Sequence, residues 1–198
     1  SIMRSKPRFP VKLPLTAIAL AALTACTGVT VSRVDHAFQY DPFDASAAGG
    51  GDRQMQVVVL GNPFDIPHGQ LEKAVIDSMQ ASSFPIPINF AINPENPDPS
   101  RPYRVVLAFN PDAMRDPGEL CAVGDDLKTT ASADGRLTLM GAFCSTDTYV
   151  SHGIARASDV GGAGSKTFDD MIFQLTASLF PGRSPHDQSG GEPPLPAT

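Results

Sequence analysis

The stretch DGRLTLMGAF, residues 134–143, decides the fold that the sequence predicts. Asp-Gly is a strong signal for a tight hairpin turn, and the apolar run Leu137–Phe143 follows it. Another run, Leu127–Ala131, lies before the turn, and a third, Thr148–Arg156, comes later. Short runs separated by turn signals predict an antiparallel meander over residues 121–157.

Two cysteines lie on either side of this turn, Cys121 and Cys144. Folding the chain at Asp134-Gly135 brings Cys121 close to the position opposite Cys144, which predicts a disulfide between them. Free thiols and a metal site are the alternatives. Two isolated cysteines without neighbouring histidines make a poor ligand set for a metal.

Four further runs predict strands. Valine at alternate positions predicts a first strand over residues 29–38. The dense apolar run Met55–Leu60 predicts a central strand covered on both faces. Residues 86–92 and 103–109 alternate apolar with other side chains, which predicts a hairpin. Pro87 has no amide proton, so we expect the first strand of that hairpin at an edge of the sheet.

Two segments have the apolar period of amphipathic helices. The first covers Pro67–Ser82. In the second, Thr167 is the predicted N-cap, Asp170 stands in the capping-box position, and Pro181-Gly182 ends the helix. Together, these elements predict the α+β class: a mostly antiparallel sheet of about six strands with two amphipathic helices packed on one face.

The remaining segments are predicted to be loops or tails. Residues 41–53 contain three consecutive glycines and predict a flexible loop. Residues 183–198, rich in Pro, Gly and Ser, predict a disordered tail. The length between these ends suits a domain of ordinary size, so we expect a single domain over residues 29–182.

Residues 3–26 have the layout of an export signal. Four bases without any acid, Arg4, Lys6, Arg8 and Lys12, precede the apolar core Leu13–Leu23. That core is shorter than the roughly 20 apolar residues that a membrane-spanning helix needs, and it suits a removable signal peptide. The sequence that follows, Leu23-Thr24-Ala25-Cys26, resembles the lipobox of bacterial lipoproteins.

This resemblance implies that residues 1–25 are removed as a signal peptide and that the thiol of Cys26 carries diacylglycerol, with acyl chains such as palmitate. Residues 26–28 are then the lipidated N-terminus and linker. Thr27 is not the aspartate that usually retains such lipoproteins in the inner membrane. We therefore expect an outer-membrane protein that faces the periplasm, with the inner membrane as the alternative. The periplasm is oxidising, which also favours the disulfide.

The charge of the mature chain argues against nucleic-acid partners. The whole chain has 15 Lys and Arg against 21 Asp and Glu, a net charge of −6. Removing residues 1–25, which hold four bases and no acid, leaves 11 bases and a net charge of −10. Nucleic acid and anionic headgroups repel such a chain, so we expect membrane contact through the lipid on Cys26.

Nucleotide binding is not expected either. Residues 161–167, GGAGSKT, are similar to a phosphate-binding P-loop. That motif needs a glycine directly before the lysine and another five positions earlier, where this chain has Ser165 and Val160.

No catalytic or metal site is recognisable. The four histidines (His36, His68, His152 and His186) are scattered and lack the spacing of a zinc-binding helix. We expect His152 on a sheet face, since no acid stands at ligand spacing beside it. Asp125-Asp126 is interpreted as a solvated turn rather than a cation site. The sequence therefore predicts no catalytic residue, metal or cofactor, and a protein that is not an enzyme.

We expect a non-catalytic accessory or assembly lipoprotein of the bacterial cell envelope that binds an envelope protein. The order of elements is similar to that of small envelope lipoproteins that assist penicillin-binding proteins or lipid transporters. A periplasmic carrier of a small apolar ligand or lipid is the alternative, and a hydrolase with an unrecognised site is the third hypothesis. A large apolar cavity would favour the carrier, and titratable side chains converging in a cleft would favour the hydrolase.

Overall fold

The computed structural model describes residues 28–80, 84–112, 116–123 and 127–186. In chain order, the elements are β1 (Val29–His36), α1 (Pro42–Gly49), β2 (Met55–Leu60), α2 (His68–Gln80), β3 (Phe90–Ala91), β4 (Tyr103–Phe109), the 3-10 helix η1 (Pro117–Cys121), β5 (Leu137–Ser145), β6 (Thr148–Ala157) and α3 (Lys166–Leu179). The strands form one sheet in the order β1-β6-β5-β4-β2-β3. The α+β class and the six-stranded sheet are confirmed.

The sheet is antiparallel on one side and parallel on the other. β6 pairs antiparallel with β1 and β5, and β5 pairs antiparallel with β4. β2 runs parallel to both of its neighbours, β4 and β3. Parallel neighbours need a crossover rather than a tight turn, and α2 supplies it because it lies between β2 and the next two strands in the chain.

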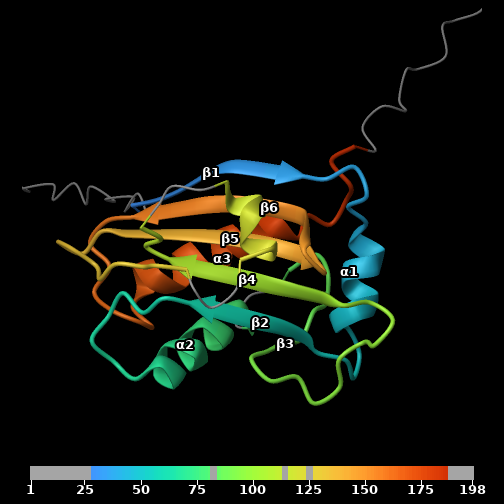
Figure 1. Cartoon of the computed structure of the whole chain (residues 1–198), viewed down its shortest axis with the longest axis horizontal. Helices are drawn as coiled ribbons and strands as arrows, with labels where there is room; N and C mark the ends of the chain where they lie inside the picture. The colour runs from blue at the N-terminus through green and yellow to red at the C-terminus, as the bar shows by residue number, and fades with distance from the viewer. Residues whose placement is uncertain (1–27, 81–83, 113–115, 124–126, 187–198) are drawn as a thin grey trace, which may run out of the picture.

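Helices α2 and α3 cover one face of the sheet, as predicted (Figure 1). Their buried stripes follow the helical period and pack in one cluster with side chains of the strands. The helices contribute Leu71, Val75, Met79, Phe168, Met171, Ile172, Leu175 and Leu179, and the central strands contribute Val105, Leu107, Phe109, Leu139 and Phe143. In α3 the N-cap is Ser165 rather than Thr167, and its Oγ accepts from the N–H of Phe168 at 3.4 Å.

Residues 42–49 form α1, so the prediction of a flexible loop there is wrong. Oδ1 of Asp41 accepts a hydrogen bond from the N–H of Phe43 at 2.8 Å and caps the helix. Pro42 suits the first turn because it needs no amide partner there. Helix α1 lies at one end of the sheet (Figure 1), and its Ala45 and Ala48 are buried. An apolar face made only of alanines gives little periodic signal, and the glycines that follow obscured it.

The two predicted hairpins are also wrong. Residues 86–92 contribute only the two-residue edge strand β3, which pairs with β2, and β4 lies on the other side of β2. Residues 127–131 make one isolated bridge, between Thr129 and Pro111. Asp134 and Gly135 do form a tight turn with positive φ angles of 54° and 68°, but it closes only the bridge from Ala133 to Arg136.

The reason for the different pairing is burial. β4 has five consecutive buried residues, Val105 to Phe109, with side chains on both faces of the sheet. As the antiparallel partner of β5 it buries far more apolar surface than residues 127–131, none of which is fully buried. Within the described residues, no helix has the length and apolar content needed to cross a bilayer.

Candidate functional site

The second face of the sheet is covered by η1, which lies across β5 and β6 as the short yellow-green coil in Figure 1. Leu120 and Cys121 of η1 pack with Val106, Met140 and Ile154 of the strands in a smaller buried cluster. A disulfide joins Cys121 to Cys144 of β5, with a Cα–Cα distance of 5.5 Å. The predicted bridge is confirmed, but it fixes η1 onto the face of the sheet instead of crossing a hairpin.

Beside η1 lies an open groove of about 670 Å³, between the end of β1, η1 and the turn from β5 to β6. We call it the His152 groove and define it by six side chains that line it: Asp35, Asp116, Glu119, Asp147, Tyr149 and His152. Four of the six are carboxylates. The groove therefore combines an acidic rim with two aromatic rings.

His152 is the buried centre of the groove, at 5 % exposure. Its Nε2 atom lies 3.5 Å from Oδ1 of Asp116 and 3.9 Å from Oδ2 of Asp35. Its Nδ1 atom is buried and has no hydrogen-bond partner among the described residues. Buried polar atoms without a hydrogen-bond partner are uncommon in folded proteins, so this atom marks His152 as unusual.

Tyr149 joins the same cluster. Its hydroxyl donates a hydrogen bond to Oδ2 of Asp35 at 3.1 Å, and its ring packs edge-on against the His152 ring with the centroids 4.7 Å apart. The hydrogen bond to the Asp35 carboxylate raises the pKa of the Tyr149 phenol, because ionising the phenol would place two negative oxygens side by side. Tyr149 therefore stays neutral and acts as a donor to Asp35.

Two backbone features place these side chains. The register of β1 against β6 shifts between Ser32 and Asp35, and Arg33 has a positive φ of 52°. Bulges of this kind re-aim side chains at the edge of a sheet, and this one directs Asp35 toward Tyr149. Gly118 leaves room for the rings, since a Cβ there would lie 2.7 Å from Cδ1 of Tyr149 and 3.2 Å from Cδ2 of His152.

Covalent catalysis would need a nucleophile beside His152. No serine, threonine or cysteine is among the described residues that line the groove, and the Tyr149 hydroxyl donates to Asp35. Within the described part of the chain, no group of three or more His, Cys, Asp and Glu residues is arranged to hold a metal ion. The four acids of the groove supply hydrogen-bond acceptors with negative charge.

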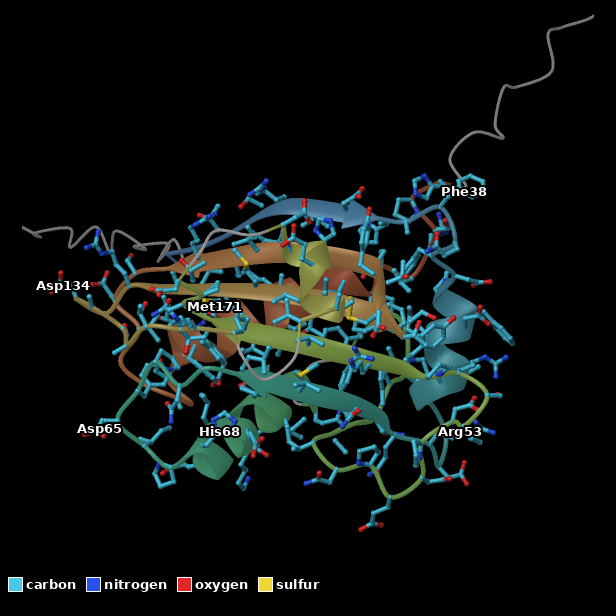
Figure 2. All side chains as sticks on the ribbon, viewed as in Figure 1. Phe38, Arg53, Asp65, His68, Asp134 and Met171 are labelled. Carbon is cyan, nitrogen blue, oxygen red and sulfur yellow. A yellow bond between two sulfur atoms is a disulfide. The ribbon has the colours of Figure 1, made fainter. Side chains whose placement is uncertain are left out.

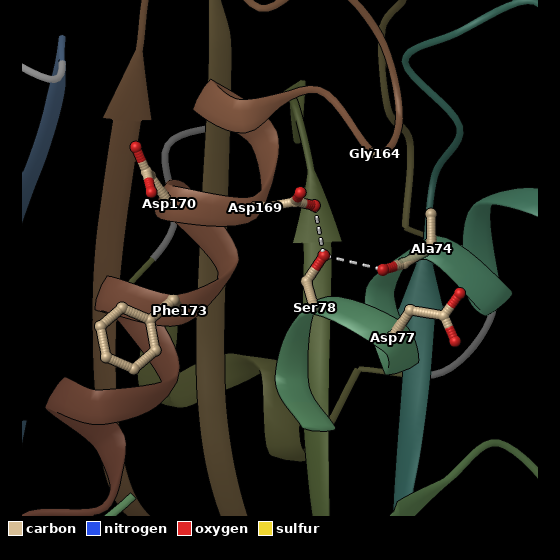
Figure 3. A pocket seen from close by; sticks show the side chains of 7 residues that line it. All are labelled: Ala74, Asp77, Ser78, Gly164, Asp169, Asp170 and Phe173. Atoms are coloured by element: carbon tan, nitrogen blue, oxygen red, sulfur yellow. Dashed lines mark hydrogen bonds between the residues drawn. The ribbon is translucent and has the colours of Figure 1, made fainter. Parts of the chain in front are cut away.

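A second hollow, of about 440 Å³, lies between α2 and α3, beside the glycine-rich segment 161–167 that is similar to a P-loop in sequence (Figure 3). Oγ of Ser78 lies 2.7 Å from Oδ1 of Asp169 and 2.8 Å from the carbonyl oxygen of Ala74. Asp77 and Asp170 also line the hollow. Asp169 and Asp170 at the start of α3, together with Asp77 of α2, oppose phosphate binding here, whereas the helix start of a P-loop attracts phosphate.

The other candidate residues do not join the His152 groove. Nε2 of His36 lies 2.9 Å from the carbonyl oxygen of Ser178, Nε2 of His186 lies 2.9 Å from the carbonyl oxygen of His36, and Nε2 of His68 lies 3.5 Å from Oε1 of Glu72. Cys26 and the pair Asp125-Asp126 lie outside the described residues. Sequence spacing missed the groove because the two acids nearest to His152, Asp35 and Asp116, come from β1 and from the residue before η1, far from His152 in the chain.

No protein-family model matches this chain, and no curated protein matches it. Among solved structures, the chain is similar to the PelC dodecamer from Paraburkholderia phytofirmans, with 13% identity and a TM-score of 0.41. A leucine-to-methionine variant of that dodecamer gives 16% identity and a TM-score of 0.37. Each alignment covers 76% of this chain and 96% of the other.

Proposed function

We propose that this protein is a lipid-anchored accessory lipoprotein of the bacterial cell envelope, which acts by binding another protein and has no catalytic activity of its own. The anchor is Cys26, by its resemblance to a lipobox. The folded domain follows directly, since β1 begins at Val29. The proposed location is the periplasmic side of the outer membrane, with the inner membrane as the alternative.

The observation that carries the binding role is the exposure of two phenylalanines at the corner between β1 and α1. Phe38 is 86% exposed and Phe43 is 76% exposed. Figure 2 shows Phe38 projecting from this corner into open space. Large aromatic side chains are enriched in protein interfaces, because each buries much apolar surface on binding.

The corner lies at the far end of β1 from the tether. The strand has eight residues, and at about 3.3 Å per residue it spans about 26 Å. A domain held at the start of β1 therefore presents Phe38 and Phe43 away from its lipid. That position favours a protein partner over the membrane surface itself.

The carrier hypothesis has less support. The space between the sheet and the helices, where an apolar ligand would lie, is filled by aromatic side chains. The Phe143 and Phe180 rings have centroids 4.8 Å apart, and the Phe109 and Phe168 rings stack at 6.0 Å.

A hydrolase is the second candidate, and one observation favours it: His152 lies between two carboxylates in an open groove. Without a side-chain nucleophile, such a site would need to activate water by general base catalysis. If the protein is a hydrolase of this kind, His152→Asn abolishes turnover of an ester or glycoside substrate by the purified chain. Under the binding proposal, there is no turnover to lose.

The test is site-specific photocrosslinking in cells that produce the lipidated protein. A photoreactive amino acid is placed at Phe43 in one strain and at Asp65, an exposed residue at a different loop, in the control. We expect a defined adduct with an envelope protein from position 43 only. No adduct from position 43, together with a small molecule that copurifies with the protein, would favour the carrier instead.

A further inference from the structure

The His152 groove brings together acceptors that keep free lone pairs. Oδ2 of Asp35 accepts from the Tyr149 hydroxyl at 3.1 Å and Oδ1 of Asp116 accepts from the N–H of Gly118 at 2.9 Å, and each carboxylate oxygen can accept a further hydrogen bond. Carboxylate oxygens accept hydrogen bonds only, and a neutral imidazole has one accepting nitrogen. Oδ1 of Asp116 and Oδ2 of Asp35 lie 3.5 and 3.9 Å from Nε2 of His152. These three atoms come from the residue before η1, from β1 and from β6, so the fold alone brings them together.

We propose that this groove binds a primary ammonium group, the lysine side chain of the protein partner. An ammonium carries three donors on one small nitrogen. Charge-assisted N–H···O bonds are about 2.7–2.9 Å long, so one nitrogen can reach two acceptors that stand 3.5 or 3.9 Å apart. The number of donors, the charge and the size of the group all fit.

The surroundings favour a cation as well. Glu119 and Asp147 add two more carboxylates to the lining, and Arg33 is the one Lys or Arg among the described residues that line the groove. Arg104, nearby, donates to the carbonyl oxygen of Cys121 at 2.7 Å and lies 3.7 Å from Asp147. The rings of Tyr149 and His152 supply an aromatic wall of the kind that attracts cations.

A lysine fits better than a guanidinium or a metal ion. A guanidinium is a planar fork that suits a single carboxylate in one plane, whereas the acceptors here belong to two carboxylates and an imidazole from three separate segments. A metal ion would need a group of three ligands with suitable geometry, and the described residues contain none.

The position of the groove beside the exposed corner makes the protein partner the source of the ammonium. Asp35 lies on the same strand as the exposed corner and three residues before Phe38, so a protein that covers Phe38 also reaches the groove. The inference therefore rests on the proposed function for the identity of its ligand. The acceptor geometry stands without it.

The test is an NMR titration of the mature lipidated chain in detergent micelles, following the imidazole resonances of His152. The probe is the peptide acetyl-Gly-Lys-Gly-amide, and the matched control peptide carries Nζ-acetyl-lysine. We expect saturable shifts from the first peptide and none from the second. Equal shifts from both peptides would overturn the proposal, and this comparison uses the native protein only.

Variants test the acceptors. The Asp116 side chain is 55% exposed, so we expect Asp116→Asn to weaken binding of the lysine peptide about three- to five-fold, as for a half-exposed ion pair. Asp65→Asn makes the same change of charge outside the groove and should leave the affinity unchanged. Equal weakening by both variants would mean that net charge alone attracts the peptide, which would overturn the site.

A titration with spermidine tests whether the ligand is a free polyamine rather than a lysine side chain of the partner. Binding of spermidine much tighter than that of the peptide would overturn the partner lysine as the source. If neither the peptides nor spermidine bound, the groove proposal would be wrong. The crosslinking test at Phe43 would be unaffected, so the two proposals can be contradicted independently.

Discussion

Gly118 shows at the residue scale how closely η1 sits on the sheet. A Cβ at this position would lie 2.7 Å from the Tyr149 ring, closer than real Cβ contacts allow. We expect Gly118→Ala to lower the free energy of unfolding by about 1–3 kcal/mol, the usual cost of overpacking, as measured by urea denaturation.

Gly69 in α2 provides the control for that experiment. A Cβ there meets only Oε2 of Glu72, at 4.0 Å. Gly69→Ala should therefore be neutral or stabilise the protein by up to about 1 kcal/mol, because alanine favours the helix. If Gly118→Ala were as harmless as Gly69→Ala, the close packing of η1 on Tyr149 would be wrong.

Asp98 anchors the proline-rich connection before β4 and gives the protein an acid-sensitive point. Its carboxylate accepts from the hydroxyl of Ser100 at 2.7 Å and from its N–H at 2.9 Å, and it pairs with Arg101 and Arg53. The Ser100 hydroxyl contributes most. Together these groups hold the pKa of Asp98 well below its usual range, although burial opposes them.

The lowered pKa of Asp98 determines how the stability of the fold depends on pH. The pKa is lower in the folded than in the unfolded state, so the unfolded chain binds more protons in acid. The stabilisation is present above about pH 4, the ordinary range of an aspartate, and is lost as the pH falls below it. In Asp98→Asn, Tm should fall at neutral pH and then depend less steeply on pH below about 4. Parallel Tm curves for the two proteins would contradict this role.

His152 illustrates what sequence reasoning cannot reach at the residue scale. Strand alternation predicts Val150, His152 and Ile154 on one face of the sheet. Ile154 packs in the cluster under η1, whereas Val150 packs in the cluster with the helices, because the pairing of β5 with β6 shifts register beside it. The bulge that aims Asp35, and the position of Asp116 before η1, depend on how distant segments pack. Neither has a local signal, so the acidic partners of His152 could be found only in three dimensions.

At the scale of elements, the disulfide holds η1 against the sheet. Both cysteines are buried, and they stand 23 residues apart in the chain. We expect the Cys121→Ala/Cys144→Ala variant to lose about 2–4 kcal/mol of stability, with changed His152 resonances because Asp116 is no longer held. Reduction of the native protein should lower Tm to the same extent and have no effect on the variant. Unchanged His152 resonances in the variant would contradict this account of η1.

The start of α3 offers a test between two caps. The sequence favours Thr167, whereas Ser165 occupies the cap position. We expect Ser165→Ala to lower the free energy of unfolding by about 0.5–1 kcal/mol, a modest N-cap effect. Thr167→Ala, inside the first turn, should change it far less. The reverse order in thermal denaturation would restore the predicted cap.

Helices and strands with a strong apolar periodicity could be predicted from the sequence, but the pairing of the strands could not. The apolar stripes of α2 and α3 and the runs of β1, β2, β4, β5 and β6 could be recognised along the chain. The pairing of β4 with β2 and β5 could not, because a hairpin between sequential strands is the commoner local solution. The α2 crossover and the burial of β4 on both faces override it.

At the scale of the whole molecule, the account depends on Cys26. The tether would fix which end of β1 faces the membrane and which end presents Phe38 and Phe43. It would also place the chain in the oxidising compartment that suits the Cys121–Cys144 bridge. In that orientation, the groove near the far end of β1 would face a partner rather than the membrane.

Intact-mass spectrometry of the protein extracted from bacterial membranes tests the cleavage before Cys26 and the lipidation of its sulfur most directly. The account predicts a mature chain that begins at Cys26 and carries diacylglycerol on its sulfur, and a Cys26→Ser variant that lacks the lipid. A native chain that keeps residues 1–25, or that begins at an unmodified Cys26, would contradict it.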